Sequence, residues 1–321
     1  MPTCGSIFLS DHVESRHAEH LDAAATGVPR VVVRQGGHLD GDPDGVEIAF
    51  FSGDLFPDRT AEFWRPVLAM RNLRWLHAYN AGVDHWVFQK ILDRGVRLTN
   101  SSGASAVPIA HTVMLYILAL SRHLGRFAAA QARKLWEPHD IEDLSGRVLG
   151  VIGLGPIGLE VARLGQAFGM RTIGLRREAR GDEPCETWPL ARLGELLPIA
   201  DYVVLALPLT KETTHILDAR SLALLRPTAR VINVGRGQLV DEAALIDALT
   251  AGRIAGAALD VFETEPLPPE SPLWAFPNVI VTPHSAGNNP GNDERATAIF
   301  LDNLGRFQRG EPLRNEIFGS K

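Results

Sequence analysis

The stretch that decides the fold is Val148–Gly158, which reads Val-Leu-Gly-Val-Ile-Gly-Leu-Gly-Pro-Ile-Gly. Its first five residues are apolar and mostly β-branched, which is typical of a strand buried on both faces. Gly153, Gly155 and Gly158 follow in G-x-G-x-x-G spacing, and a helical pattern then leads to an apolar run at Thr172–Leu175. Strand, glycine turn, helix and strand in about 30 residues predict a dinucleotide site, with an ordinary glycine turn as the alternative.

The three glycines have separable physical roles in such a site. Gly153 allows the tight turn, Gly155 lets the backbone approach a pyrophosphate, and Gly158 lets helix and strand pack closely. The helix begins at about Pro156 and Ile157, and its free N–H groups are available to phosphates.

The end of the second strand departs from the simplest form of this site. Asp or Glu usually stands there to hold the ribose hydroxyls of NAD, but this chain reads Leu175-Arg176-Arg177. A carboxylate would repel a 2′-phosphate, whereas a guanidinium can hold one with two hydrogen bonds. We therefore predict a preference for NADP(H) over NAD(H), with NAD(H) use still open; a solvated basic loop is the alternative.

Composition bounds the class of protein. The 321 residues suffice for two domains, and 45% hydrophobic and 22% charged residues are typical of a globular protein. The net charge of −6 gives no reason to expect nucleic acid or an anionic membrane as a partner. Two cysteines allow no disulfide framework or cysteine metal cluster, so no metal site is predicted. The N-terminus lacks the features of a signal peptide and the longest apolar run is too short for a bilayer, so we expect a cytoplasmic location by default.

Residues 1–100 alternate strand-like runs with polar or helical connections, which predicts a small α/β domain with a parallel sheet. The small polar run at 100–105 predicts the first crossing between domains. The amphipathic helix expected at 293–309 is predicted to return to the first domain. We therefore expect a substrate domain of residues 1–100 plus 285–321 and a dinucleotide-binding domain of residues 101–284. The strands expected in the first domain are Val31–Arg34, Val46–Phe51, Leu73–Tyr79 and Val96–Thr99.

From Val148 onward the alternation predicts six strands, the number in a complete two-halved dinucleotide fold. The four that follow Thr172–Leu175 are Tyr202–Leu207, Val231–Val234, Ala255–Leu259 and Val279–Thr282. Helices are expected at 106–124, 126–135, 190–197, 219–225 and 241–250.

Three polar residues follow expected strands on the side of the sheet that carries the glycine turn: Arg236, Glu265 and His284. Hydride transfer to a carbonyl needs an acid for the developing alkoxide, and histidine suits that role near neutral pH. It also needs a cation for the substrate, and arginine can clamp a carboxylate with two hydrogen bonds. A carboxylate beside the histidine would favour the imidazolium form.

Each of these residues also has a structural explanation: a surface turn for Arg236, a solvated loop for Glu265 and a hydrogen-bonded structural histidine for His284. Their joint placement at strand ends of a dinucleotide fold favours the catalytic interpretation.

The chain resembles the D-isomer-specific 2-hydroxyacid dehydrogenases. The resemblance covers essentially all of the second domain and, in the first, rests on Ala-Gly-Val-Asp at 81–84 and on the layout. It is carried by Gly-Leu-Gly-Pro-Ile-Gly at 153–158, Leu-Pro-Leu-Thr-Lys-Glu-Thr at 207–213, Asn-Val-Gly-Arg-Gly at 233–237, Leu-Asp-Val-Phe-Glu-Thr-Glu-Pro-Leu at 259–267 and Asn-Val-Ile-Val-Thr-Pro-His-Ser-Ala-Gly at 278–287.

The resemblance implies an α/β fold of two Rossmann-like domains, a flavodoxin-like substrate domain and a doubly wound dinucleotide-binding domain. It implies that Arg236 binds the substrate carboxylate and carbonyl and that His284 is the acid/base. Glu265, directly before proline, would pair with His284, rather than Glu263. Backbone amides near Ala81, Gly82 and Val83 would complete the carboxylate site.

The resemblance also implies the cofactor contacts and a homodimer built through the cofactor domain. Asp260 would reach the nicotinamide amide. The full set of expected cofactor-binding residues is Gly153, Gly155, Pro156, Ile157, Gly158, Arg176, Arg177, Leu207, Pro208, Thr213, Val234, Gly235, Asp260 and Gly287.

Four positions refine the comparison with the family. Arg176 replaces the common ribose-binding aspartate, which is similar to the NADP-using glyoxylate and hydroxypyruvate reductases. The related formate dehydrogenases carry glutamine in place of Glu265, which argues against that activity. His111 stands where many relatives have glutamate and is assigned no catalytic role. Trp136 would reach the partner's active site, as an aromatic does in some relatives, or serve in packing.

We therefore predict an NADPH-preferring oxidoreductase that reduces a 2-oxo acid to the D-2-hydroxy acid. Glyoxylate, hydroxypyruvate and aryl- or alkylpyruvates all remain open as substrates, because specificity would come from loops near residues 52–55 and 136. One alternative is an NAD-linked D-2-hydroxyacid dehydrogenase running in the oxidative direction. Another is a dinucleotide-sensing interaction protein on the same scaffold, similar to the C-terminal-binding-protein corepressors.

Overall fold

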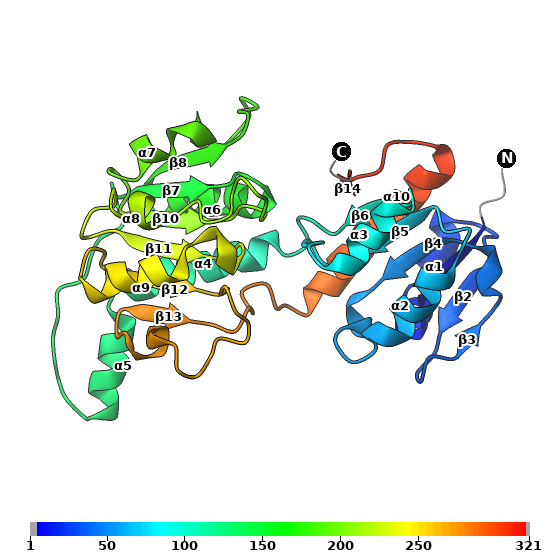
Figure 1. Cartoon of the computed structure of the whole chain (residues 1–321), viewed down its shortest axis with the longest axis horizontal. Helices are drawn as coiled ribbons and strands as arrows, with labels where there is room; N and C mark the ends of the chain where they lie inside the picture. Colours follow the sequence, from blue (N-terminus) through cyan, green and yellow to red (C-terminus); the bar gives the residue numbers. More distant parts are fainter. Residues whose placement is uncertain (1–4, 319–321) are drawn as a thin grey trace. The chain divides into compact units, whose positions relative to one another are not determined.

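The computed structural model describes residues 5–318, which form two compact units (Figure 1). Unit 1 comprises the described residues up to Ala104 and from Asn289 onward, and unit 2 comprises Ser105–Asn288. Each unit contains one predominantly parallel sheet with helices on both faces. This confirms the predicted α/β class with two Rossmann-like domains.

The sheet of unit 1 has the strand order β14-β6-β5-β4-β1-β2-β3, in which β3 and β14 are antiparallel to their neighbours. The sequence prediction missed β1, β3 and β14; β3 and β14 have only two residues each, and pairing with neighbouring strands defines all three. The strands are β1 (Ser6–Ser10), β2 (Arg30–Val33), β3 (Leu39–Asp40), β4 (Val46–Phe51), β5 (Trp75–Ala78), β6 (Arg97–Asn100) and β14 (Glu316–Ile317).

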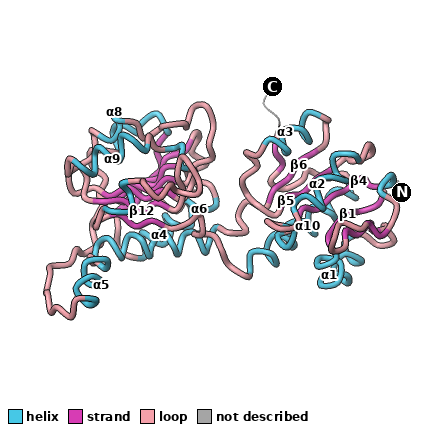
Figure 2. Tube along the Cα trace, turned by 60° about the horizontal axis from the view of Figure 1, so that its bottom comes forward, coloured by secondary structure: helices cyan, strands magenta, loops and turns pink. Residues whose placement is uncertain are grey.

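Four α-helices cover the two faces of this sheet (Figure 2). α2 and α3 pack on one face around Phe63 and Phe88, and α1 and α10 pack on the other around Leu21 and Phe300. The helices are α1 (Asp11–Ala24), α2 (Thr60–Ala69), α3 (Trp86–Asp93) and α10 (Gly291–Arg309), with 3₁₀ turns η1 (Pro43–Gly45) and η2 (Gly53–Leu55).

The sheet of unit 2 is entirely parallel, in the order β13-β12-β11-β10-β7-β8-β9. The prediction of six strands was wrong, because the described chain adds the edge strand β9. Its sequence, Glu-Thr-Trp-Pro, is partly exposed and has no buried apolar run, so only its pairing with β8 defines it. The strands are β7 (Val148–Ile152), β8 (Arg171–Arg176), β9 (Glu186–Pro189), β10 (Tyr202–Leu205), β11 (Arg230–Asn233), β12 (Gly256–Leu259) and β13 (Val279–Val281).

α4 and α6 pack on one face of this sheet, and α7, α8 and α9 pack on the other. Two expected helices are reduced to short turns: the one at 190–197 is a 3₁₀ turn followed by α7, and the one at 219–225 is the single-turn α8. The helices expected at 106–124 and 126–135 each end three residues earlier than predicted. The helices are α4 (Ala106–Ser121), α5 (Leu124–Ala132), α6 (Pro156–Ala167), α7 (Leu193–Leu196), α8 (Ala219–Leu222) and α9 (Glu242–Thr250), with 3₁₀ turns η3 (Leu190–Arg192), η4 (Gly237–Leu239) and η5 (Pro272–Ala275).

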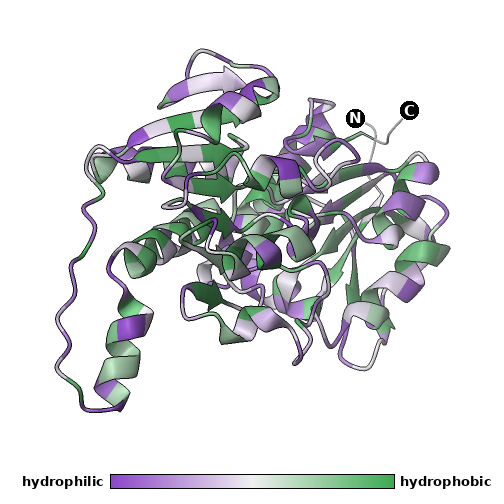
Figure 3. Cartoon of the chain, turned by 60° about the vertical axis from the view of Figure 1, so that its left-hand side comes forward, coloured by the Kyte–Doolittle hydropathy of each residue, from purple (hydrophilic) through white to green (hydrophobic). Residues whose placement is uncertain are grey.

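α5 and the loop after it project from the rest of unit 2 (Figure 3). Arg122 and His123 separate α4 from α5, and His123 has a left-handed backbone conformation with φ of 52°. Among residues 5–318, no single helix is long and apolar enough to cross a membrane; α4 and α5 reach that composition only together, across a bend of 65°. α4 buries its apolar residues in the core of unit 2, which accounts for its composition.

Candidate active site

The glycine turn after β7 contains three glycines in three different environments. Gly153 has a positive φ of 103°, which a residue with a side chain rarely adopts. A Cβ on Gly158 would lie 1.9 Å from the carbonyl oxygen of Gly153, so α6 packs directly on the turn. A Cβ on Gly155 would meet nothing within 4 Å. The turn is therefore closed on its inner side and open at Gly155, which fits a phosphate group approaching the backbone.

The N-terminus of α6 supplies the donors that such a group needs. Gly155 is the N-cap and Pro156 the first helical residue, so the N–H groups of Ile157 and Gly158 have no acceptor within the helix, and the first helical hydrogen bond runs from the Leu159 N–H to the Gly155 carbonyl. The twelve-residue helix also directs the positive end of its dipole to this point. The residues predicted to cradle a pyrophosphate therefore lie in a geometry suited to it.

Arg176 ends β8 next to this turn. The parallel pairing of β7 with β8 aligns Ile152 with Leu175, and the Gly153 N–H donates to the Leu175 carbonyl at 2.9 Å. The Arg176 guanidinium is half-buried and pairs with Glu183 at 2.7 Å, a partner that the sequence analysis did not identify. Arg177 is exposed.

The loop after β10 lies beside the strand that leads to Arg236. A Cβ on Gly235 would lie 3.0 Å from the Leu207 carbonyl oxygen, so the two loops touch through backbone. Thr213 is buried, and its hydroxyl donates to the Pro208 carbonyl at 2.9 Å, which fixes the turn. Val234 is buried and extends the pairing of β11 with β10 through its N–H and the Leu205 carbonyl.

Arg236 follows β11 in a turn held by its flanking residues. The Asn233 side chain accepts from the Gly235 N–H at 3.1 Å and donates to the Arg236 carbonyl at 2.9 Å. A Cβ on Gly237 would lie 1.9 Å from the carbonyl carbon of Phe262, so only glycine lets this turn contact the loop after β12. The Arg-Gly step thereby brings Arg236 to the loop that carries Glu265.

Asp260 follows β12 and anchors the loop after β13. It is 3% exposed, and its Oδ1 accepts from the Thr282 hydroxyl at 2.6 Å and the Ser285 N–H at 2.9 Å. Its Oδ2 accepts from the Ala286 N–H at 2.9 Å. The Asp260 carboxylate therefore holds the Thr282 side chain before His284 and the backbone of the two residues after it, a positioning role that the sequence pattern did not indicate.

His284 and Glu265 form a hydrogen-bonded pair. His284 Nδ1 lies 2.8 Å from Glu265 Oε2, and the other carboxylate oxygen accepts from the Phe262 N–H at 3.0 Å. Because a carboxylate only accepts, Nδ1 is the donor and Nε2 is left for another partner. The backbone of His284 has a positive φ of 49°, and its N–H donates to the Asp260 carbonyl at 2.8 Å. The arrangement presents one imidazole nitrogen, with its tautomer set by a carboxylate, at the carboxyl edge of the sheet.

Glu263, two residues before Glu265, has a different partner. Its Oε1 lies 2.8 Å from His215 Nε2 and 3.3 Å from the Glu242 backbone nitrogen. The two glutamates of the Glu-Thr-Glu-Pro segment therefore face two different histidines, and Glu265 faces the one that follows β13.

The segment Ala81–Val83 follows β5 in unit 1. The Asn100 amide donates to the Ala81 carbonyl and the Asn80 amide donates to the Gly82 carbonyl. Among the described residues, no backbone acceptor pairs with the three N–H groups of this segment. The loop is therefore held by its carbonyls while its donors stay available to an anion.

Other residues considered in the sequence analysis lie at the surface of unit 2. The Trp136 side chain is 97% exposed on the projecting loop after α5, and His111 is exposed on α4. Gly287 follows the His284 loop, and a Cβ there would lie 3.3 Å from Ile109 of α4. No group of three His, Cys, Asp or Glu side chains within residues 5–318 is arranged to hold a metal ion.

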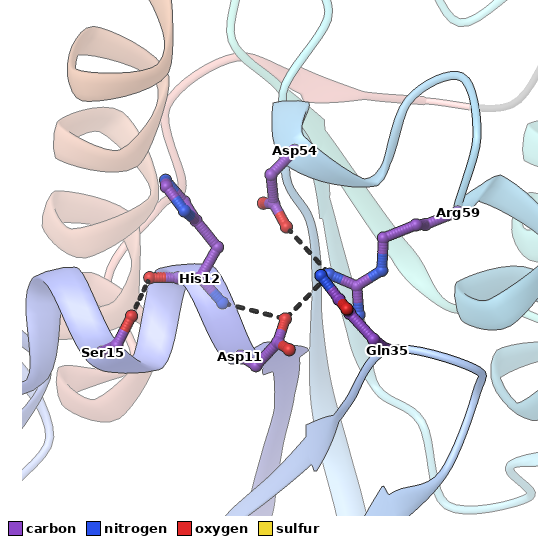
Figure 4. Close-up of a pocket in the computed structure, with 6 residues that line it drawn as sticks. All are labelled: Asp11, His12, Ser15, Gln35, Asp54 and Arg59. Atoms are coloured by element: carbon purple, nitrogen blue, oxygen red, sulfur yellow. Dashed lines mark hydrogen bonds and ion pairs between the residues drawn. The ribbon is translucent and has the colours of Figure 1, made fainter.

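A separate hollow lies at the carboxyl edge of the unit 1 sheet and is lined by six polar residues (Figure 4). Arg59 pairs there with Asp11 at 2.8 Å and with Asp54 at 3.6 Å, and Glu62 binds the same guanidinium at 2.8 Å. This ion cluster ties the start of α2 to the start of α1 and contains none of the residues predicted to act in catalysis. The hollow is lined by Asp11, His12, Ser15, Gln35, Asp54 and Arg59.

The two Rossmann-like units, together with the glycine turn and the His284–Glu265 pair of unit 2, define an NAD(P)-dependent oxidoreductase of the Rossmann type. Residues 114–286 match the model of the D-isomer specific 2-hydroxyacid dehydrogenase NAD binding domain. The chain is 36% identical over 253 residues to a glyoxylate reductase of Korarchaeum cryptofilum, covering 76% of this chain and 75% of that protein. The chain therefore belongs to the D-isomer-specific 2-hydroxyacid dehydrogenase family, as its sequence motifs predicted.

Further relatives and solved structures share this fold. A D-3-phosphoglycerate dehydrogenase of Methanocaldococcus jannaschii is 35% identical over 245 residues, which are 74% of this chain but 46% of that protein. A D-isomer specific 2-hydroxyacid dehydrogenase of Xanthobacter autotrophicus Py2, solved with NADPH and MES, has a TM-score of 0.79 and 33% identity, covering 98% of both chains. An NADPH-dependent glyoxylate/hydroxypyruvate reductase of Sinorhizobium meliloti, solved with NADP and sulfate, has a TM-score of 0.79 and 29% identity, covering 97% of both chains.

Proposed function

We propose that this protein reduces a 2-oxo acid to the D-2-hydroxy acid with NADPH as the preferred reductant. The observation that carries the proposal is the 2.8 Å pair between His284 and Glu265, at the same sheet edge as the glycine turn. Carbonyl reduction needs a proton donor beside a dinucleotide site, and this pair meets that need.

His284 donates the proton to the carbonyl oxygen. Its Nδ1–H is held by Glu265, so Nε2 carries the proton that the developing alkoxide takes up. Glu265 stabilises the imidazolium before transfer by its negative charge. Asp260 is a positioning residue, because its carboxylate holds the backbone of the loop that carries His284.

Arg236 binds the carboxylate and carbonyl of the 2-oxo acid. Its guanidinium can make two parallel hydrogen bonds to a carboxylate and can withdraw electron density from the adjacent carbonyl. The N–H groups of Ala81, Gly82 and Val83 are the further carboxylate donors in this proposal, supported by their lack of backbone acceptors among the described residues.

NADPH supplies the hydride when it is bound. The glycine turn and the N-terminus of α6 would hold its pyrophosphate, and the open space at Gly155 would let the phosphates approach the backbone. The loops that carry Leu207, Pro208, Thr213 and Gly235 border the same sheet edge. Arg176 and Arg177 would bind the 2′-phosphate, and the two similar structures solved with NADPH or NADP support NADP(H) as the cofactor.

The substrate class in this proposal is a small 2-oxo acid such as glyoxylate or hydroxypyruvate. The names of the similar reductases support this choice. We also propose a homodimer, as the family resemblance implies, with exposed Trp136 near the contact between subunits. Sedimentation of the purified protein at twice the monomer mass would support this, and a monomer would refute it.

The experiment that tests the function follows the absorbance of NADPH and of NADH with glyoxylate, hydroxypyruvate, pyruvate and phenylpyruvate. Turnover that favours NADPH supports both the reaction and the role of Arg176. Turnover that favours NADH keeps the reaction and refutes the 2′-phosphate site. Tight cofactor binding without turnover of any 2-oxo acid would favour the dinucleotide-sensing alternative.

A further inference from the structure

The positive charge of Arg176 is paired with a carboxylate of the same unit. Its Nη1 donates to Glu183 Oε1 at 2.7 Å, and the Arg176 and Glu183 side chains are 15% and 3% exposed. The pair lies at the end of β8, seven residues apart in sequence, and the loop between them folds back over the guanidinium. The charge that would attract a 2′-phosphate is therefore opposed by a carboxylate in direct contact.

The Glu183 carboxylate is fixed by the backbone of the same loop. Oε1 also accepts from the Arg180 N–H at 2.7 Å, and Oε2 accepts from the Gly181 N–H at 2.8 Å. These backbone hydrogen bonds, together with the Arg176 guanidinium, lower the pKa of Glu183 to about 2. Protonation therefore does not remove its charge at any pH near neutrality.

We propose that Glu183 sets the strength of cofactor discrimination by competing with the 2′-phosphate of NADP(H) for the Arg176 guanidinium. This inference rests on the proposed function and names a residue that tunes it. A 2′-phosphate binds a guanidinium best through two parallel hydrogen bonds, and the Nη1 that Glu183 occupies is one of the donors. The phosphate would also lie close to a fixed negative charge.

The second arginine at this strand end is opposed in a similar way. Arg177 is exposed; the pKa of Glu212, in the loop after β10, is lowered first by a hydrogen bond from Thr210 and by its own backbone, and more weakly by the charge of Arg177. Each arginine at the end of β8 thus has a glutamate nearby. Of the two glutamates, only Glu183 is both shielded from water and in direct contact with its arginine. Solvent screens the exposed pair, so Glu183 is the stronger opponent.

The test uses two nucleotide fragments that differ only in the 2′-phosphate: adenosine 2′,5′-bisphosphate and 5′-AMP. Calorimetric titration of the whole protein gives a dissociation constant for each, and their ratio measures the discrimination without any hydride transfer. In Glu183→Gln the ratio should rise roughly three- to tenfold in favour of the bisphosphate, because a like charge is removed while the side chain keeps its size. The affinity for 5′-AMP should stay within about twofold of wild type.

The matched control is Glu186→Gln. Glu186 lies three residues further on, in β9, and pairs with Arg171 at 3.0 Å, away from the strand end that carries Arg176. The Glu186→Gln change also removes one negative charge from an edge of this sheet, and it should leave the ratio of the two dissociation constants unchanged. In an Arg176→Gln background, Glu183→Gln should no longer raise the ratio, which shows that the effect acts through the guanidinium.

The outcomes separate the inference from the proposed function. A ratio that falls in Glu183→Gln would mean that Glu183 orients Arg176 for the phosphate, and it would overturn the inference. An unchanged ratio, or equal binding of both fragments in every variant, would overturn it too. A protein that lacks reductase activity but shows the predicted ratios would refute the proposed function and leave the inference standing.

Discussion

Two histidines of unit 2 have similar partners but different surroundings. His284 pairs with Glu265 through Nδ1 at 2.8 Å, and His215 pairs with Glu263 through Nε2 at 2.8 Å. His284 follows β13 at the carboxyl edge of the sheet, and its loop is held by Asp260. Both histidines have a carboxylate partner, so the partner does not distinguish them. The position of His284 at the carboxyl edge of the sheet is what makes it the proposed proton donor to the substrate.

Replacing His284 by glutamine should lower kcat for 2-oxo acid reduction by roughly 10²–10⁴-fold, because the proton donor to the alkoxide is lost. The dissociation constant for NADPH should stay near that of wild type. Steady-state kinetics and cofactor titration on one preparation measure both quantities.

His215→Gln is the matched control, since it removes an imidazole with a glutamate partner at the same distance. Its effect on kcat should be a factor of about three at most, because the proposed proton donor, His284, and its partner Glu265 stay in place. Equal losses in the two variants would contradict the assignment of His284 as the acid.

A third histidine, His77 of β5, provides a pH prediction for stability. It is fully buried between the Thr99 and Ser101 hydroxyls at 2.7 and 3.0 Å, and burial lowers its pKa from 6.5 to about 3. The unfolded chain therefore takes up a proton below pH 6.5 that the folded chain does not. The stabilising contribution is complete above pH 6.5 and is lost as the pH falls toward 3.

The free energy of unfolding should fall by up to about 1.4 kcal/mol per pH unit below pH 6.5 because of His77. His77→Gln should be less stable at pH 7 but should lose less stability between pH 6.5 and 5. Urea unfolding at these pH values measures the slope, and exposed His20→Gln is the control. A slope in His77→Gln equal to that of wild type would contradict the prediction.

At the scale of elements, the glycine turn joins β7 to α6 through one close backbone contact. Gly158 lies against the Gly153 carbonyl, whereas Gly155 faces open space with an ordinary negative φ of −77°. The two glycines of one motif therefore serve different purposes, since Gly158 lets the helix pack on the turn and Gly155 leaves space for a ligand.

Gly158→Ala should destabilise the protein by about 1–3 kcal/mol, because the added methyl group forces α6 away from the turn. Gly155→Ala is its matched partner and should change the melting temperature little. It should nevertheless weaken NADPH binding by roughly tenfold or more, because the Cβ occupies the approach to the backbone. Thermal unfolding and cofactor titration of both variants test this; unchanged binding in Gly155→Ala would remove the turn from the cofactor site.

At the scale of the whole molecule, unit 1 is completed by a helix from the far end of the chain. Phe300 of α10 is fully buried, and its ring stacks on Phe50 of β4 with centroids 4.3 Å apart. It also stacks on Trp75 of β5 at 5.4 Å. The core of unit 1 on this face of the sheet therefore depends on residues separated by more than 200 positions.

Phe300→Ala should lower the free energy of unfolding by about 3–5 kcal/mol, because it leaves a cavity in a packed aromatic cluster. Exposed Phe318→Ala, in the same C-terminal segment, is the control and should have little effect. Binding of adenosine 2′,5′-bisphosphate should survive the Phe300 change at low temperature, since the residues proposed to bind it all lie in unit 2. Loss of this binding in a protein that retains its helical content would contradict that separation.

The sequence by itself determined the α/β class, the glycine turn and the strand ends that carry Arg236, Asp260 and His284. These features are local: a buried strand needs an apolar run, a tight turn needs glycine, and parallel strands end at one edge. The family motifs then linked these strand ends to one type of chemistry.

Only the tertiary structure decided which charged groups meet. The edge strand β9 carries no apolar signal, Glu183 lies in a polar loop that folds back on Arg176, and Asp260 binds a loop more than twenty residues away. Contacts of this kind depend on strand pairing and on the path of loops, which a pattern of residue types does not encode. In the proposed site, the arginines at the end of β8 favour a 2′-phosphate, and the fold adds the Glu183 carboxylate that pairs with Arg176.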